Sequence, residues 1–290
     1  HVITTRIEHH AVLYAAKFLQ ENGFEVTFLD VDSEGRVRPE DVARALTDRT
    51  ILVSVMFANN EIGTIQPVAK IGALCRERGV PFHTDAVQAV AHVPIDVKAM
   101  NIDLLSMSAH KFYGPKGVGA LYVRKGIRIE NLIHGGGQER GRRATTENVA
   151  GIVGLGAAIE LTSSRMKESS ARIAALRDML IDGVMKSIPY AKLNGAPSGE
   201  RLPNNANFSF IGIEGETLLL DLDVEIGLNR KVKSGEWNRL DAYTVEFHRR
   251  VRAGFHALCQ ADPARWVIID ASQPIEAVQE AIRQVVVARL

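Results

Sequence analysis

The alternation of short β-branched runs with helical patterns over residues 1–135 constrains the fold of this chain more than any other feature. An order of this kind favours a mostly parallel sheet covered by helices, so we expect an α/β fold. Gly23, Gly35 and Gly79 stand where helix ends and turns need glycine. The expected elements are strands over 2–5, 25–29, 51–56, 81–84, 104–106 and 120–123, and helices over 10–20, 39–46 and 68–78, with a short turn near 97–101.

The second half of the chain predicts further, smaller parts. A long helical pattern over 145–188 is typical of one or two helices, and from Asp221 onward arginine and lysine become frequent. The later expected elements are strands over 206–213 and 265–270, an apolar element over 216–222, and helices over 245–258 and 274–290. We therefore expect three domains: a large domain over 1–144, a partial small domain over 145–220, and a tail over 221–290.

The bulk composition excludes several classes of protein. The 290 residues are 46% apolar and 24% charged, as in ordinary globular proteins, and the net charge of +1 predicts neither nucleic acid nor a membrane as partner. We find no apolar run near the ~18 residues that span a bilayer and no secretory signal. Two cysteines, Cys75 and Cys259, are too few for a disulfide framework. We therefore expect a cytoplasmic protein.

The most informative cluster of polar residues surrounds Lys111. The segment SMSAHKFYGPKG (106–117) places this lysine beside Ser108 and His110, after an apolar run and before a Gly/Pro-rich turn. A pocket lysine can form a Schiff base with a carbonyl compound, usually pyridoxal phosphate, and the neighbouring hydroxyl and imidazole can bind a phosphate. The alternative is a surface lysine before a turn, with Ser108 capping the turn and His110 packed in the core.

Three more candidates follow other expected strands. Asp85 can pair with a pyridinium nitrogen, and Gln88 can reach the ring hydroxyl if a helix starts there; the alternative for Asp85 is a helix N-cap. Asn60 can bond the ring hydroxyl or a substrate carboxylate, or it can simply form a turn. Because ligands bind at the carboxyl ends of parallel strands, we expect Asn60, Asp85 and Lys111 to converge.

His9 and the glycine-rich loop over 134–143 complete the candidate set. The His9 ring can stack on a flat cofactor, whereas His9 and His10 at adjacent helical positions do not face one metal, and we expect no metal site. The loop and its arginines can approach an anion, and Thr146 can donate to a phosphate. The alternative for this loop is a flexible connector between domains.

These residues resemble the cysteine desulfurases of the NifS/IscS type, within the class V aminotransferase group. The resemblance covers residues 1 to about 220 and rests on EHHAV (8–12), NNEIG (59–63), TDAVQ (84–88), SAHKFYGPKG (108–117) and GGGQERG (135–141). It implies the fold of the PLP-dependent transferases, with the aspartate aminotransferase-like large domain and a small α/β domain.

The resemblance also implies roles around a pyridoxal phosphate bound to Lys111. Asp85 would face the pyridine nitrogen, Gln88 the ring hydroxyl, and His9 would stack on the ring as a second catalytic residue beside Lys111. Asn60 would lie beside cofactor and substrate.

The remaining implied roles concern the phosphate and the partners. Ser108 and His110 would hold the phosphate, and Thr146 would hold the phosphate of a neighbouring subunit, which implies a homodimer with shared sites. The implied reaction converts L-cysteine to alanine and passes the sulfur to an enzyme cysteine. From there sulfur-acceptor or iron–sulfur scaffold proteins would receive it.

Three departures from the family predict an impaired enzyme. The family's N-terminal stretch and its phosphate loop are missing before His1, and the family's late substrate-carboxylate arginine has no placed equivalent. After EGETLLL (214–220) the chain continues with DLDVEIGL (221–228) instead of a Ser/Gly-rich loop with the catalytic cysteine. Cys75 lies on a helical pattern and Cys259 in the tail, so neither replaces it easily.

The tail over 221–290 resembles the carboxyl-terminal part of bacterial thymidylate kinases, through segments such as NRL (238–240) and VIIDAS (267–272). The sequence contains no Gly-x-x-x-x-Gly-Lys-Ser/Thr loop, so phosphoryl transfer is not expected. Two alternatives to a desulfurase-type enzyme stay open. One is a non-catalytic truncated or chimeric chain, and the other is a different PLP enzyme of the same group, such as a lyase.

Overall fold

A computed structural model of the chain describes residues 1–211, 218–234 and 244–289. The chain divides into two compact units. The first, which we call the sheet unit, comprises His1–Gly183 and Leu193–Phe208, and the second, the tail unit, comprises Val184–Lys192 and Ser209–Leu290. Contacts thus group the residues differently from the three expected domains, whose boundaries stay a prediction.

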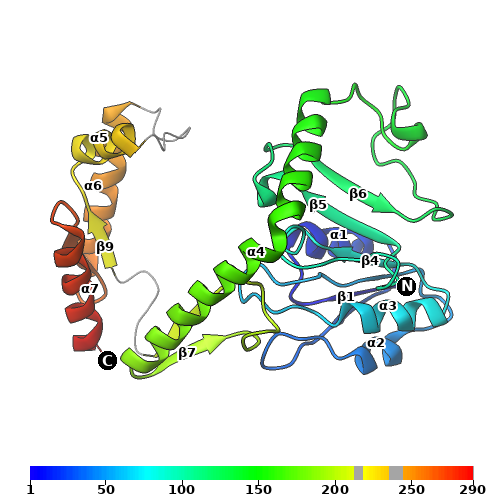
Figure 1. The fold of residues 1–290 in the computed structure, drawn as a ribbon, viewed down its shortest axis with the longest axis horizontal. Helices are drawn as coiled ribbons and strands as arrows, with labels where there is room; N and C mark the ends of the chain where they lie inside the picture. Colours follow the sequence, from blue (N-terminus) through cyan, green and yellow to red (C-terminus); the bar gives the residue numbers. More distant parts are fainter. Residues whose placement is uncertain (212–217, 235–243, 290) are drawn as a thin grey trace. The chain divides into compact units, whose positions relative to one another are not determined.

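The sheet unit is built on six strands in the order β2-β1-β3-β4-β5-β6. Every neighbouring pair is parallel except β5 and β6, which are antiparallel, so the expected mostly parallel sheet is confirmed (Figure 1). The strands are β1 (Val2–Thr5), β2 (Val26–Leu29), β3 (Leu52–Ser54), β4 (Phe82–Asp85), β5 (Leu104–Ser108) and β6 (Gly119–Val123).

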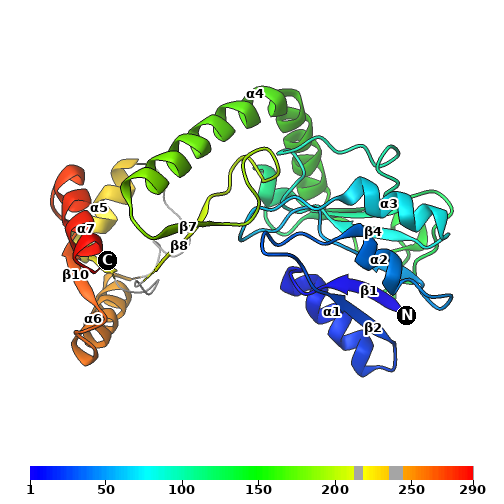
Figure 2. The ribbon, with the colours of Figure 1, turned by 90° about the horizontal axis from the view of Figure 1, so that it is seen from below.

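Three helices follow the first strands and cover this sheet. α2 (Pro39–Ala45) and α3 (Val68–Glu77) pack against each other, and Figure 2 shows α1 (His10–Glu21) on the other side of β1 from them. Val42 of α2 and Ile71 of α3 are fully buried in one cluster with Ile3, Val53 and Phe82 of the strands. Consecutive apolar strand residues are buried, as for Val2 and Ile3 of β1, and this burial supplies the main stabilisation of the unit.

A single helix of 39 residues, α4 (Val149–Ser187), follows the sheet, where the sequence pattern left one or two helices open. After it, β7 (Ala191–Asn194) and β8 (Asn207–Phe210) form a separate two-stranded sheet; residues 212 and 213 of the expected strand lie outside the described residues. The buried Arg177 donates to the Leu202 carbonyl at 2.8 Å, and the buried Arg201 donates to the Ile62 carbonyl at 2.9 Å. Arg177 thus attaches α4 to the segment before β8, and Arg201 attaches that segment to the turn after β3.

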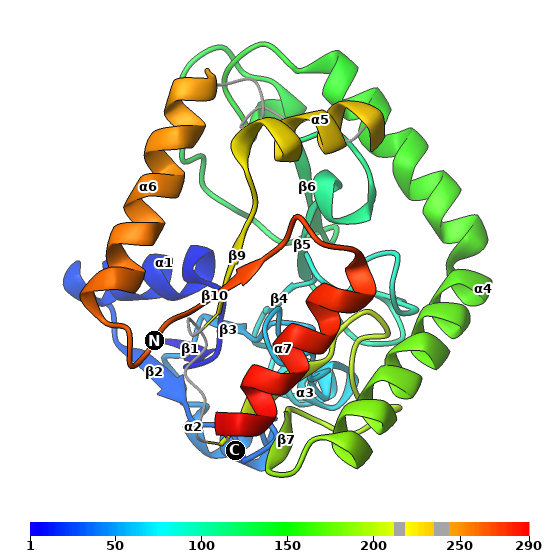
Figure 3. The ribbon, with the colours of Figure 1, turned by 90° about the vertical axis from the view of Figure 1, so that its left-hand side faces the viewer.

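In the tail unit, β9 (Leu218–Asp221) and β10 (Val267–Asp270) form a parallel pair, visible side by side in Figure 3. Its helices are α5 (Val224–Ser234), α6 (Val245–Ala261) and α7 (Ile275–Arg289), which confirms the strand and both helices expected in this region. The NRL segment (238–240) and residues 214–217 lie outside the described residues. Within the described part of the chain, no helix is both long enough and apolar enough to span a membrane.

Candidate active site

Four neighbouring parallel strands end next to the predicted site residues. His9 follows β1, Asn60 follows β3, Asp85 ends β4, and Lys111 follows β5, and these strands are adjacent in the order β1-β3-β4-β5. The ladder between β3 and β4 continues to the end of β4, because the Phe57 amide donates to the Asp85 carbonyl at 2.8 Å. The structure therefore places these four positions at the carboxyl end of the sheet, where Asn60, Asp85 and Lys111 were expected to converge.

Asp85 is a buried carboxylate, only 8% exposed. Its Oδ1 accepts the Val87 amide at 2.9 Å, and no bond to its Oδ2 is found among the described residues. The segment after it forms turns over residues 87–92 instead of the helix on which the reach of Gln88 depended. Gln88 is half-buried three residues after Asp85, on this turn.

Lys111 lies on η1 (Ala109–Phe112), a short 3₁₀ turn directly after β5. Ala109 and Phe112 are buried and anchor the turn, whereas Lys111 is exposed. The turn then closes tightly, because the Gly114 amide donates to the Ala109 carbonyl at 2.9 Å. A Cβ at Gly114 would lie 2.8 Å from the Ala109 Cβ, so only glycine fits there.

Two side chains brace the turn that presents Lys111. The Ser108 hydroxyl and the His110 Nδ1 are 2.8 Å apart, in hydrogen-bond contact, so these two predicted phosphate-binding groups lie together. His92, half-buried on the segment after β4, has a hydrogen bond between its ring and the Lys111 backbone; burial lowers the pKa of His92 and that bond opposes the shift. No sequence signal points to His92, because it lies outside every polar cluster.

His9 and Asn60 occupy the two other strand ends. His9 is exposed at the N-terminus of α1, where its Nδ1 accepts the Ala11 amide at 3.2 Å. Asn59, not Asn60, is the buried amide: its Nδ2 donates to the Ile7 carbonyl at 3.0 Å, and its Oδ1 accepts the Glu61 amide at 2.9 Å. Asn59 thereby shapes the turn on which the half-buried Asn60 stands.

Two buried titratable groups near Asp85 were not among the sequence candidates. Burial raises the pKa of Glu8 to about 7, and the charge of Asp85 acts in the same direction. His83 lies between the hydroxyls of Ser54, 2.8 Å from its Nδ1, and Ser106, 2.9 Å from its Nε2, and burial lowers its pKa. Both residues stand inside recognisable motifs, but only the fold reveals that they are buried.

The glycine-rich loop and Thr146 follow the four strand ends in the sequence, and no hydrogen bond links Thr146 to them among the described residues. Thr146 is exposed and follows Thr145, which has a positive φ of 82°. Within the loop, the Gln138 amide donates to the Arg143 carbonyl at 2.7 Å. We also find no group of three or more potential metal ligands among the described residues.

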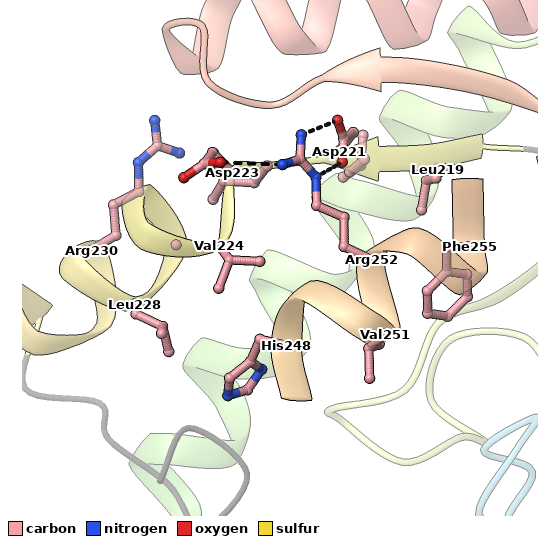
Figure 4. A pocket seen from close by; sticks show the side chains of 13 residues that line it. Leu219, Asp221, Asp223, Val224, Leu228, Arg230, His248, Val251, Arg252 and Phe255 are labelled. Carbon is pink, nitrogen blue, oxygen red and sulfur yellow. Dashed lines mark hydrogen bonds and ion pairs between the residues drawn. The ribbon is translucent and has the colours of Figure 1, made fainter. Parts of the chain in front are cut away.

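A pocket of about 710 Å³ in the tail unit contains none of the predicted site residues. Its lining includes Leu219, Val251 and Phe255, and Figure 4 shows Arg252 above them, directed at Asp221 and Asp223. Arg252 Nε donates to Asp221 at 2.7 Å, so the charged groups here pair with each other. The cavity therefore offers mainly apolar side chains to a ligand.

Comparison with known proteins identifies the relatives of this chain. The family model for aminotransferase class-V matches residues 1–262. A cysteine desulfurase IscS of Clostridium botulinum is 67% identical over 225 residues, which are 77% of this chain and 57% of that protein. A cysteine desulfurase IscS of Methanosarcina thermophila is 58% identical over 225 residues, covering 78% of this chain and 55% of that protein.

Solved structures show the same relationship. A NifS-like protein superposes with a TM-score of 0.69 at 40% identity, covering 81% of this chain and 61% of that one. SspA in complex with cysteine superposes with a TM-score of 0.63 at 36% identity, covering 82% of this chain and 62% of that one. The chain thus spans little more than half the length of the relatives it matches.

The fold is that of the PLP-dependent transferases, an α/β architecture with a mostly parallel central sheet. Within that class, the chain belongs to the class-V aminotransferase family.

Pyridoxal phosphate is the cofactor of this family, and the residues at the strand ends fit it. Lys111 offers an exposed primary amine, and the paired Ser108 and His110 lie on the same turn. Asp85 offers a buried carboxylate whose Oδ2 has no bond among the described residues. An amine, an anion and a hydroxyl–imidazole pair are the groups that an aldehyde, a pyridine nitrogen and a phosphate require.

Proposed function

We propose that this chain binds pyridoxal phosphate at Lys111 and takes L-cysteine as substrate, as a cysteine desulfurase-type enzyme. The observation that supports this most strongly is the arrival of His9, Asn60, Asp85 and Lys111 at the ends of four adjacent parallel strands. The relatives named as cysteine desulfurases, and a structural neighbour solved with cysteine, support the choice of substrate.

Each strand-end residue has a task in this proposal. When bound, the cofactor draws electrons from the α-carbon of an amino acid and weakens the bonds there. The Lys111 amine attaches the cofactor and can move a proton at that carbon, and Asp85 keeps the ring nitrogen protonated. The half-buried Gln88 would reach the ring hydroxyl from the turn after Asp85 instead of from a helix, while Ser108 and His110 would hold the phosphate.

The remaining candidates would orient ring and substrate. The exposed His9 ring stacks on the cofactor, and Asn60 donates to the ring hydroxyl or to the substrate. Thr146 holds the phosphate of a second subunit, which makes the working form a homodimer with shared sites. Its exposure, with no bond to the other candidates in the described chain, suits a residue that acts on a neighbour.

We further propose that sulfur transfer within this chain is impaired. A nucleophilic cysteine must be accessible and partly ionised, yet Cys75 and Cys259 are both buried. Burial, together with the charge of Asp103, raises the pKa of Cys75 to about 12, so its thiol stays protonated at neutral pH. Sulfur would then leave only to an external thiol, such as that of a sulfur-acceptor or iron–sulfur scaffold protein.

Two other hypotheses assign a different function to the same site. A lyase of the same group would need the cofactor residues but no enzyme cysteine, which the burial of Cys75 and Cys259 favours. A non-catalytic chain would keep the fold and lose the chemistry. The thymidylate kinase resemblance of residues 221–290 stays a prediction, and the proposed function makes no use of it.

A reduction trap tests the proposal. The purified chain is incubated with pyridoxal phosphate, reduced with borohydride and digested, and the modified lysines are mapped by mass spectrometry. We expect modification concentrated at Lys111 and lost in Lys111→Ala, whereas Lys116→Ala, an exposed lysine five residues further on, keeps it. Scattered or absent modification would refute cofactor binding at this site.

The second step separates the enzyme readings. The reconstituted chain is given L-cysteine and dithiothreitol, and alanine and pyruvate are measured. Alanine with sulfide supports a desulfurase that uses an external thiol, and pyruvate with sulfide supports a lyase. If neither alanine nor pyruvate forms faster than with free cofactor, the non-catalytic chain is the remaining hypothesis.

A further inference from the structure

Glu8 is a buried carboxyl group to which the proposed function assigns no task. It is 5% exposed and lies directly after β1, one residue before His9. Its Oε1 accepts two hydrogen bonds, from the Met56 amide at 2.8 Å and from the Thr5 hydroxyl at 2.9 Å. Its Oε2 is buried without a hydrogen-bond partner among the described residues.

This environment disfavours the ionised form of Glu8. No lysine, arginine or histidine forms an ion pair with Glu8 in the described part of the chain. A buried carboxylate without a cation is costly, and a group in that position takes up a proton instead. Because Oε1 already accepts two bonds, Oε2 is the oxygen that can bind the proton.

Asp85 is the second buried carboxyl group in this region, and its surroundings differ. Its Oδ1 accepts a backbone amide, and its charge acts on Glu8. Two neighbouring buried carboxyl groups do not readily both ionise, because their like charges repel. Both groups are buried, Glu8 at 5% and Asp85 at 8% exposure, but only Glu8 has a buried oxygen without a hydrogen-bond partner among the described residues.

We infer that Glu8 is a positioning residue that holds a proton in the folded chain and so adds no second negative charge beside Asp85, the carboxyl group proposed for the cofactor ring. The neutral Glu8 ties the chain before His9 to β3 through the Met56 amide. The inference rests on the proposed cofactor site for its purpose. The protonation of Glu8 itself is a property of the chain without cofactor.

The other titratable groups around this region do not compensate a charge on Glu8. On β4, His83 bonds two serine hydroxyls and its pKa is lowered by burial, so it is neutral. On the segment after β1, Arg6 pairs with Asp30 at 2.8 Å and both are exposed, and His9 is exposed too. Asp85 is the one described titratable group whose charge acts on Glu8.

The sign of the pH effect follows from the raised pKa. Glu8 has an ordinary value of 4.5 when unfolded and about 7 when folded, so the folded chain binds more protons between these values. Its contribution to stability is therefore complete below pH 4.5 and is lost as the pH rises through 7. Burial also lowers the pKa of His83, which destabilises the folded chain in acid. This effect is the same in wild type and in every variant of Glu8.

The test compares wild type with Glu8→Gln, which keeps an acceptor oxygen and cannot ionise. Glu21→Gln, at an exposed position at the end of α1, is the matched control. Urea unfolding of the chain without cofactor is followed by far-UV circular dichroism from pH 5 to pH 8.5. Both tryptophans, Trp237 and Trp266, belong to the tail unit, so their fluorescence reports that unit separately.

We expect the midpoint of Glu8→Gln to exceed that of wild type by an amount that is small at pH 5, grows up to about pH 7 and stays constant above it. The tryptophan signal should be unaffected, and Glu21→Gln should follow wild type throughout. Infrared difference spectra of wild type minus Glu8→Gln should show a protonated-carboxyl band at pH 6 that disappears by pH 8.5. Parallel pH profiles of wild type and Glu8→Gln, or no such band at pH 6, would overturn the inference.

A second arm concerns the cofactor. At pH 6, we expect Glu8→Gln to bind pyridoxal phosphate within about twofold of wild type, since it mimics the protonated form, and Glu8→Ala to bind at least tenfold more weakly. Equal weakening in both variants would show that the charge of Glu8 is required. If wild type fails to bind while the pH profiles still differ, the proposed function fails and the proton assignment stands.

Discussion

The sheet unit and the tail unit contain similar apolar strands, but they bury them to different extents. In the sheet unit, Ile3, Val53 and Phe82 of adjacent parallel strands are fully buried. In the tail unit, β9 and β10 are equally apolar, yet Leu220 is 52% exposed and Ile268 is 42% exposed. Parallel strands are stable when several pair together under helices on both faces, and a two-stranded sheet leaves much of its apolar surface in water.

The two units also manage charge differently. The sheet unit buries Arg201, whose guanidinium donates to the carbonyls of Ala196, Ile62 and Asn194. The tail unit pairs Arg252 with Asp221 and Asp223 at its surface. A buried guanidinium bound to fixed carbonyls restricts the backbone around the turn after β3, whereas surface ion pairs contribute little.

The largest effect that would test this contrast comes from the apolar core. Phe82→Ala removes a fully buried ring and should cost about 3–5 kcal/mol, whereas Phe255→Ala in the tail unit, at a ring 44% exposed, should cost about 1 kcal/mol. Urea unfolding followed by circular dichroism and by tryptophan fluorescence separates the units. Equal losses for the two variants would mean that the units are equally well packed.

Removal of a buried guanidinium should have the next largest effect. Arg201→Met leaves buried carbonyl oxygens unpaired and should cost about 3 kcal/mol in the sheet unit. Arg283→Met is the matched control in the tail unit, since Arg283 is 70% exposed and pairs with Glu280 on its own helix. Thermal unfolding measures both, and a control as damaging as Arg201→Met would contradict the comparison.

A smaller effect concerns the start of α6. The Thr244 hydroxyl accepts the Phe247 amide at 3.3 Å, and Thr244→Ala should cost about 1 kcal/mol in the tail unit. Thr162→Ala is its counterpart in α4, where the hydroxyl donates to the Ala158 carbonyl at 2.7 Å and caps no helix end. Thr162→Ala should therefore leave stability unchanged. Tryptophan fluorescence should respond to the first variant alone.

The smallest expected effect concerns the ion pairs of Asp221, which are lost only at acid pH. Hydrogen bonds from Arg252 and His256 lower the pKa of Asp221 from 3.8 to about 2. The pairing therefore stabilises the tail unit above pH 3.8 and is lost as the pH falls toward 2. Asp221→Asn should lower the unfolding midpoint modestly at pH 7 and converge with wild type near pH 2. A difference that persists in acid would point to packing instead of charge.

Much of the sheet unit could be predicted from the sequence, because its signals are local. The strands β1, β4 and β5 were expected within two residues of their bounds, and their order along the chain implied a parallel sheet. Polar residues such as Asp85 and Lys111 stand directly after these strands. Since parallel strands share one carboxyl edge, sequence position alone indicated that they would meet there.

Whether Gln88 can reach the ring hydroxyl of the cofactor was less predictable. It depended on a helix after Asp85, and turns form over residues 87–92 instead. The Ala89 and Val90 amides both donate to the Ala86 carbonyl, and the apolar side chains of this segment are buried against the sheet. A short segment of this kind follows its packing and not its helical pattern.

By itself, the sequence determined the class of fold and the residues at the strand ends, because periodicity and chain order are local properties. The tertiary structure alone decided that Glu8 is enclosed, that His83 lies between two serine hydroxyls, and that Arg201 binds carbonyls. It also decided that similar apolar strands are buried in one unit and half-exposed in the other. Burial and the pKa values that follow from it depend on which distant segments pack against a residue, and no local pattern contains that information.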